Sequence, residues 1–148
     1  MRKIWIYLLF ISITTHAQLS KTEHAVVEVI DNNTPDAISL LKEVVNINSG
    51  TMNFDGVREV GRVFATQFRA IGFEVAWLDG EAFSRAGHLV ANHTGDPDMP
   101  KILLIGHLDT VFEPDHPFQT YREEGDLLHG PGVVDMKGGD VIILEALK

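Results

Sequence analysis

Residues 102–111 read ILLIGHLDTV, an unbroken apolar run that passes into a short segment containing histidine and aspartate. The run from Ile102 to Ile105 predicts a strand covered on both faces, as in parallel sheets. His107 and Asp109 then follow the carboxyl end of that strand, where open α/β sheets bind ligands. A neutral imidazole is a good zinc ligand, and a nearby carboxylate can hold its other ring nitrogen. The simpler interpretation of this triplet alone is structural, with His107 capping the strand and Asp109 capping a turn.

Predicted helices and strands alternate along the rest of the chain, which favours an α/β sandwich. Thr34 is a candidate helix N-cap, with Pro35 at the first helical position. Apolar residues spaced three and four apart predict a helix over 57–71, ended by Gly72. The remaining predictions are strands at 73–78 and 88–92, a hairpin within 121–129 and a helix over 141–148.

The first 17 residues have the pattern of a secretory signal peptide. Arg2 and Lys3 precede an uncharged, mostly apolar run from Ile4 to Ile13, and small residues precede the expected cleavage after Ala17. The run is well below the roughly 20 residues needed to span a bilayer. We therefore expect an exported protein, periplasmic or secreted, without membrane attachment after cleavage.

The charge and the cysteine count restrict the chemistry of the chain. Lys and Arg total 12 against 21 Asp and Glu, so the net charge of -9 argues against nucleic-acid binding. The 148 residues contain no cysteine, which excludes disulfides, thiol nucleophiles and Cys-ligated metals. Any metal must be held by histidines and carboxylates.

A second stretch, residues 130–139, reads GPGVVDMKGG. Asp135 directly follows an apolar pair, Val133-Val134, so its carboxylate is expected at the edge of the interior. A buried carboxylate is unfavourable unless a cation satisfies it. A metal ion is one such cation, and Lys137 is the structural alternative.

The two stretches together, with His107 and Asp135 at this spacing, resemble the zinc-dependent peptidases and amide hydrolases. This family includes carboxypeptidase G, acetylornithine deacetylase, succinyl-diaminopimelate desuccinylase and aminoacylase. The resemblance covers residues 34–148 and implies a three-layer α/β sandwich holding two Zn²⁺ ions, closed by an inserted lid domain. It further implies that His107 binds zinc, that Asp109 is the catalytic aspartate orienting this histidine, and that Asp135 bridges both ions. The peptide between Asp135 and Met136 is expected to be cis.

The resemblance also implies a reaction, in which a metal-activated water attacks the amide carbonyl of a peptide or acyl-amino acid. Residues 130–132 are most similar to the glutamate carboxypeptidase-like branch. In the family, the general-base Glu, further ligands and the lid, a possible homodimer surface, follow the second motif. We therefore interpret the chain as an incomplete sandwich without the lid: signal peptide 1–17, lead-in segment 18–33 and N-terminal catalytic part 34–148. Such a chain is predicted to be inactive alone. The alternative is a non-catalytic exported metal-binding or relic module.

Overall fold

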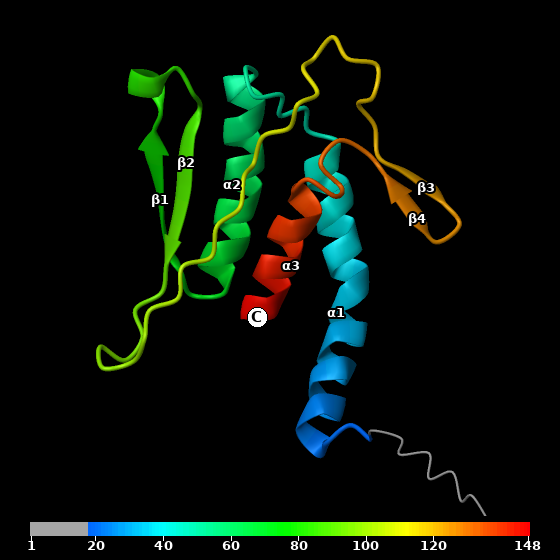
Figure 1. Ribbon diagram of the computed structural model, residues 1–148, viewed down its shortest axis with the longest axis vertical. Helices are drawn as coiled ribbons and strands as arrows, with labels where there is room; N and C mark the ends of the chain where they lie inside the picture. Colours follow the sequence, from blue (N-terminus) through cyan, green and yellow to red (C-terminus); the bar gives the residue numbers. More distant parts are fainter. Residues whose placement is uncertain (1–17) are drawn as a thin grey trace, which may run out of the picture.

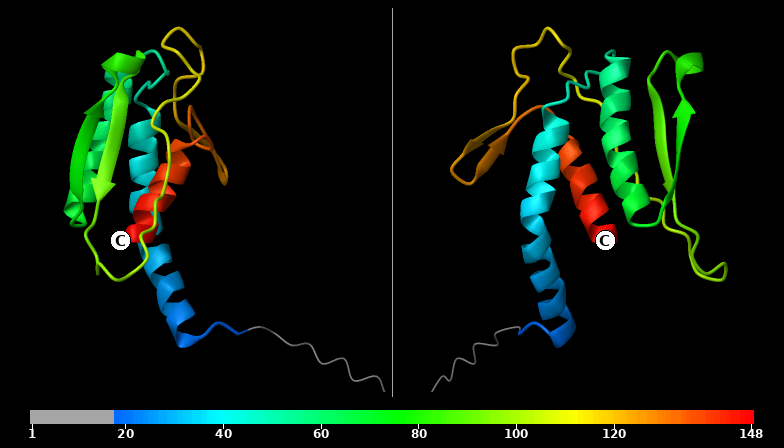
Figure 2. Two further views of the ribbon diagram at one scale, coloured as in Figure 1. Left: turned by 60° about the vertical axis from the view of Figure 1, so that its left-hand side comes forward. Right: turned by 180° about the vertical axis from the view of Figure 1, so that it is seen from behind.

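The computed structural model describes residues 18–148 and arranges them as three helices flanked by two β-hairpins (Figure 1). The predicted signal peptide, residues 1–17, lies outside the described residues. Helix α3 packs along α1, and the β1–β2 hairpin lies on the outer side of α2 (Figure 2). In chain order the elements are α1 (Lys21–Val45), α2 (Phe54–Ala70), β1 (Glu74–Asp79), the 3-10 helix η1 (Glu81–Phe83), β2 (Gly87–Asn92), β3 (Arg122–Glu124), β4 (Leu127–His129) and α3 (Lys137–Leu147).

Helix α1 is one long helix, so the predicted helix start at Thr34 is wrong. Ser20 caps α1 instead, because its side chain accepts from the backbone N–H of Glu23 while the Glu23 carboxylate accepts from the Ser20 N–H. Thr34 donates its hydroxyl to the carbonyl of Ile30, 2.7 Å away, and Pro35 is accommodated inside the helix. The stronger upstream capping box therefore overrides the weaker Thr-Pro signal.

The helix α2 and the strands that follow it agree with the sequence prediction. Asn53 accepts from the Gly56 N–H at the start of α2, and Gly72, with φ of +89°, directly follows the C-cap residue. Strands β1 and β2 pair antiparallel, with Trp77 opposite Leu89. Alternate residues of both strands are partly buried, since one face of the hairpin packs on α2. The predicted hairpin within 121–129 is confirmed as β3 and β4.

The core lies where the three helices meet. Val44 and Val45 of α1, Phe64 of α2 and Leu144 of α3 are almost completely buried in one cluster. The predicted C-terminal helix is confirmed, although it begins earlier, at Lys137. Within residues 18–148 no helix is long and apolar enough to cross a membrane.

The predicted buried strand over Ile102–Ile105 is wrong. Its four side chains are 51% to 84% exposed, and the segment pairs with no strand in the described part of the chain. A strand buried on both faces requires neighbouring strands and a covering layer on each side. The four described strands instead form two separate antiparallel pairs, in a small α/β arrangement.

Candidate metal centre

Two loops bring the predicted site residues together on one side of a pocket. The first carries His107 and Asp109, and it is anchored by a parallel bridge between Gly50 and Thr110. The second carries Asp135 and leads directly into α3, where the Asp140 N–H donates to the carbonyl of Met136. The Asp135–Met136 peptide is cis, as predicted.

The imidazole of His107 is held through both of its nitrogens. Nε2 lies 2.9 Å from Oδ1 of Asp135. Nδ1 lies 3.0 Å from the backbone oxygen of Asp109 and 3.3 Å from its Oδ1. An acidic group on Nδ1 is the usual partner of a metal-binding histidine, because it fixes the tautomer and raises the basicity of Nε2.

The charge around His107 favours its protonated form while no metal is bound. Partial burial acts to lower the pKa of the imidazole, but hydrogen bonds to Asp135 and Asp109, together with their negative charges, raise it above 6.5. A cation between these carboxylates is therefore stabilised, whether it is a proton or a metal ion.

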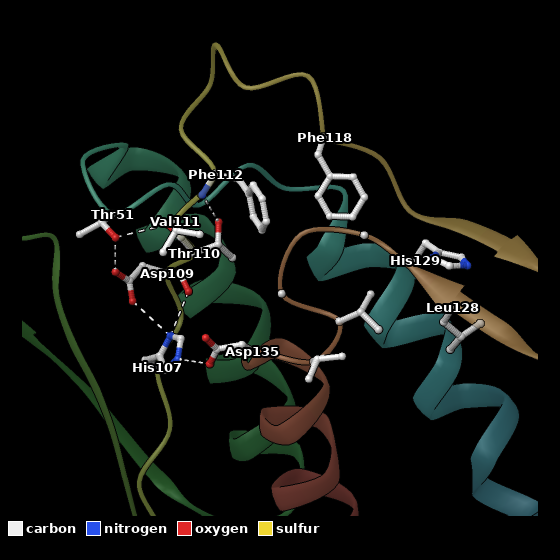
Figure 3. Close-up of a pocket in the computed structure, with 14 residues that line it drawn as sticks. Thr51, His107, Asp109, Thr110, Val111, Phe112, Phe118, Leu128, His129 and Asp135 are labelled. Carbon is white, nitrogen blue, oxygen red and sulfur yellow. Dashed lines mark hydrogen bonds and ion pairs between the residues drawn. The ribbon is translucent and has the colours of Figure 1, made fainter.

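Asp135 is more exposed than its sequence context suggested. Its side chain is 83% exposed and the preceding Val134 is 89% exposed, so the expectation of a buried apolar pair ending in a buried carboxylate is wrong. The turn that begins at Gly130 carries both residues out of the core, and both line the pocket. Figure 3 shows Asp135 beside His107. Burial of the Asp135 charge therefore gives no argument for a metal ion at this carboxylate.

Lys137 does not pair with Asp135, so the structural alternative for this carboxylate is excluded. The Lys137 ammonium is buried and donates to the carbonyls of Val44 and Ile47, at 2.8 and 2.9 Å. Burial lowers the pKa of Lys137 to about 8, although the charge of Asp140 acts in the opposite direction. Lys137 thus fixes the start of α3 against the end of α1 and leaves Asp135 facing His107.

The pocket around this pair has a volume of about 420 Å³ and a largely apolar far wall. Figure 3 shows the His107, Asp109 and Asp135 side chains on one side and Phe118, Leu128 and His129 on the other. The lining residues come from five segments: Thr51, His107 with 109–112, Phe118, 128–130 and 132–135.

The chemistry of these donors fits two ligands of one zinc ion. An imidazole Nε2 and a carboxylate oxygen converge, and the second imidazole nitrogen already has its acidic partner. No group of three or more histidine, aspartate or glutamate side chains able to hold a metal occurs within residues 18–148. A zinc ion held here would thus take only part of its coordination sphere from the described residues.

Comparison with known proteins places these motifs among metallopeptidases. Residues 103–148 match the family model of peptidase family M20/M25/M40. Carboxypeptidase G2 of Pseudomonas sp. (strain RS-16) is 29% identical over 94% of this chain and 33% of its own length. Succinyl-diaminopimelate desuccinylase of Leptothrix cholodnii is 32% identical over 68% of this chain and 27% of its own length. The bovine N-fatty-acyl-amino acid synthase/hydrolase PM20D1 is 27% identical over 70% of this chain and 21% of its own length. The chain therefore spans about a third of these relatives or less.

Two residues of the site were missed by the sequence analysis. Thr51 lies in the segment between α1 and α2, and its hydroxyl donates to Oδ2 of Asp109, 2.6 Å away. Asn48 of the same segment donates to the carbonyl of Phe112 and to Gln119. No local pattern marks either residue, because their partners lie more than 50 positions away in the sequence.

Proposed function

Because the chain belongs to the M20 family of metallopeptidases and amide hydrolases, we propose that it forms the metal-binding part of a zinc-dependent amide hydrolase of the carboxypeptidase type. The substrate class is a peptide or an acyl-amino acid. Export to the periplasm or medium belongs to this proposal and is supported by the pattern of residues 1–17. The three-layer catalytic sandwich also belongs to this proposal, and the family resemblance supports it.

One observation carries the proposal, namely the convergence of His107 Nε2 and Asp135 Oδ1 at 2.9 Å. Asp109 lies behind the imidazole and directs its Nε2 toward Asp135. The exposed Asp135 side chain leaves the carboxylate accessible to a metal ion and to a second ion on its other side. We assign His107 as a ligand, Asp135 as the bridging ligand and Asp109 as the residue that positions His107.

Zinc at this position would supply Lewis-acid chemistry, lowering the pKa of a water molecule and polarising the scissile carbonyl. The protein contributes the pocket in which that carbonyl is oriented. Val111, Phe112 and Phe118 give the pocket apolar walls, and Phe112 and Phe118 meet edge to face with ring centres 5.1 Å apart. Apolar walls of this kind suit the acyl group or side chain next to the amide bond.

A non-catalytic metal-binding module is the second candidate, and the donor count favours it. His107 and Asp135 provide two ligands, whereas a catalytic zinc usually has three protein ligands and an open position. We therefore expect the 148-residue chain by itself to bind zinc without measurable hydrolysis of acyl-amino acids. Zinc-dependent hydrolysis by the purified chain would contradict this expectation and establish the catalytic function directly.

Both candidate functions include zinc binding by His107 and Asp135, so a measurement of zinc affinity tests them together. Competition with a chromophoric chelator should show zinc binding by the wild-type chain that is lost in His107→Ala and in Asp135→Asn. His129→Ala is the matched control, since His129 lines the opposite wall of the same pocket (Figure 3). Equal zinc binding by His107→Ala and wild type would refute the metal assignment.

A further inference from the structure

We propose that Thr51 is a positioning residue of the metal centre, whose hydroxyl fixes the carboxylate that orients His107. This inference rests on the proposed function, because it concerns the same site. Oδ2 of Asp109 lies 2.6 Å from the Thr51 hydroxyl oxygen (Figure 3). Oδ1 of Asp109 forms an ion pair with Nδ1 of His107 at 3.3 Å, and the same nitrogen is hydrogen-bonded to the Asp109 backbone oxygen at 3.0 Å. Each carboxylate oxygen of Asp109 thus has its own partner. We call this series of contacts, from Thr51 through Asp109 to His107, the relay.

The short distance identifies the acceptor of the Thr51 proton. A threonine hydroxyl has one proton to donate. Its two candidate acceptors are Oδ2 of Asp109 at 2.6 Å and the carbonyl of Thr110 at 3.3 Å. The first distance is typical of a hydroxyl that donates to a charged carboxylate, which is the stronger interaction. The hydroxyl is neutral, so it orients the carboxylate without placing a second charge beside it.

The backbone on both sides of this contact holds the hydroxyl in place. The Thr51 N–H donates to the Thr110 carbonyl at 3.0 Å, and the Thr110 N–H donates to the Ser49 carbonyl at 2.8 Å. Ser49, Gly50 and Thr110 are buried. These backbone hydrogen bonds hold residues 49–51 beside Thr110, which places the Thr51 side chain next to that of Asp109.

A second set of hydrogen bonds holds the loop around Thr51, in addition to the backbone bonds between residues 49–51 and Thr110. Nδ2 of Asn48 donates to the Phe112 carbonyl at 2.9 Å, and the Met52 N–H donates to Oε1 of Glu113 at 3.0 Å. These bonds tie the residues before and after Thr51 to the segment that follows Asp109. The loop is thus built as a rigid support for the segment bearing the candidate ligand, and Thr51 is its contact with the carboxylate.

Thr51→Val tests the role of the hydroxyl, since valine keeps the shape and removes the donor. We expect its zinc affinity to fall about tenfold, the lower end of the effect of removing a partner behind a metal ligand. Thr51→Ser keeps the donor and should bind zinc as the wild type does. Thr66→Val is the control, because the Thr66 hydroxyl donates to a carbonyl within α2, away from the site. Thermal unfolding of each variant separates loss of the contact from loss of the fold.

A double-mutant cycle with Asp109→Asn distinguishes the relay from a general structural role. If Thr51 acts through Asp109, Thr51→Val should reduce zinc affinity in the wild type and have little further effect beside Asp109→Asn. Should the valine variant unfold, Thr51→Ala against Thr51→Ser gives the same comparison. Wild-type zinc affinity in Thr51→Val, or fully additive effects in the cycle, would overturn this inference alone. Absence of zinc binding by the wild-type chain would instead overturn the proposed function, and this inference with it.

Discussion

Nε2 of His107 lies 2.9 Å from Oδ1 of Asp135, although 28 positions separate these residues in the sequence. Lys137 makes this approach possible because its buried ammonium ties the start of α3 to the carbonyls of Val44 and Ile47. The same side chain was the alternative partner of Asp135. Because Lys137 is held in the interior, the Asp135 carboxylate contacts His107 and is open to the proposed metal ion.

Asp109→Asn should preserve the fold and weaken zinc binding by about 10–100-fold. The amide has nearly the shape of the carboxylate, but it lacks the charge that stabilises the Nδ1-protonated imidazole of His107. Competition with a chelator measures the effect, with the exposed hairpin-turn variant Asp126→Asn as control. Zinc affinity unchanged from wild type would show that Asp109 has no part in the metal centre.

Asp140→Asn should make the protein more stable at neutral pH. Burial raises the pKa of the Asp140 carboxyl from 3.8 to about 6, and its Oδ2 has no hydrogen-bond partner among the described residues. A raised pKa in the folded state means that the contribution of Asp140 to stability is full below pH 3.8 and is lost as pH rises through about 6. Urea unfolding measures the free energy of unfolding of Asp140→Asn and of the wild type. The excess of the variant over the wild type should grow by about 2–3 kcal/mol between pH 4 and pH 7. A difference that stays constant over this range would contradict the prediction.

Lys137→Met should destabilise the chain by about 2–4 kcal/mol, because one buried and one partly buried carbonyl lose their charged donor. Methionine fills a similar volume but cannot donate to Val44 or Ile47. The free energy of unfolding in urea measures the loss, and Lys101→Met at an exposed position serves as control. If both variants have the same midpoint of urea unfolding as the wild type, Lys137 does not anchor α3.

Gly106→Ala should destabilise the site through a clash with α3. A Cβ at position 106 would lie 2.0 Å from Oδ1 of Asp140. Shortening that side chain in the double variant Gly106→Ala/Asp140→Ala should restore part of the stability, with a coupling of about 1–2 kcal/mol. Gly95→Ala is the control, since a Cβ there meets no atom within 4 Å. Additive effects of the two substitutions would argue against this contact.

Sequence patterns predicted the local elements of this fold well. The apolar spacing of α2, its terminal Gly72, the strands β1 and β2 and the β3–β4 hairpin depend on residues close together in the chain, and the structure confirms all of them. The pairing of β1 with β2 was not predicted. The start of α1 was misplaced because two capping signals competed, and the box at Ser20 prevailed over Thr34. Local rules cannot rank such signals without the energy of the whole helix.

The failures concern interactions between distant segments. Ile102–Ile105 had the composition of a buried strand, but composition does not specify the neighbouring strands that would cover it. The two motifs predicted that His107 and Asp135 share a site, and in the structure the two side chains are in direct contact. Thr51 and the anchoring role of Lys137 depend on folding the chain back over 58 and about 90 positions, and no spacing rule carries that information.

The position of a bound zinc ion tests the central claim most directly. Anomalous diffraction at the zinc absorption edge, from crystals of the chain grown with zinc, locates the ion without reference to activity. The account predicts an anomalous peak bonded to Nε2 of His107 and to a carboxylate oxygen of Asp135, with Asp109 behind the imidazole. A zinc peak at other residues, with His107 and Asp135 still paired directly to each other, would contradict it.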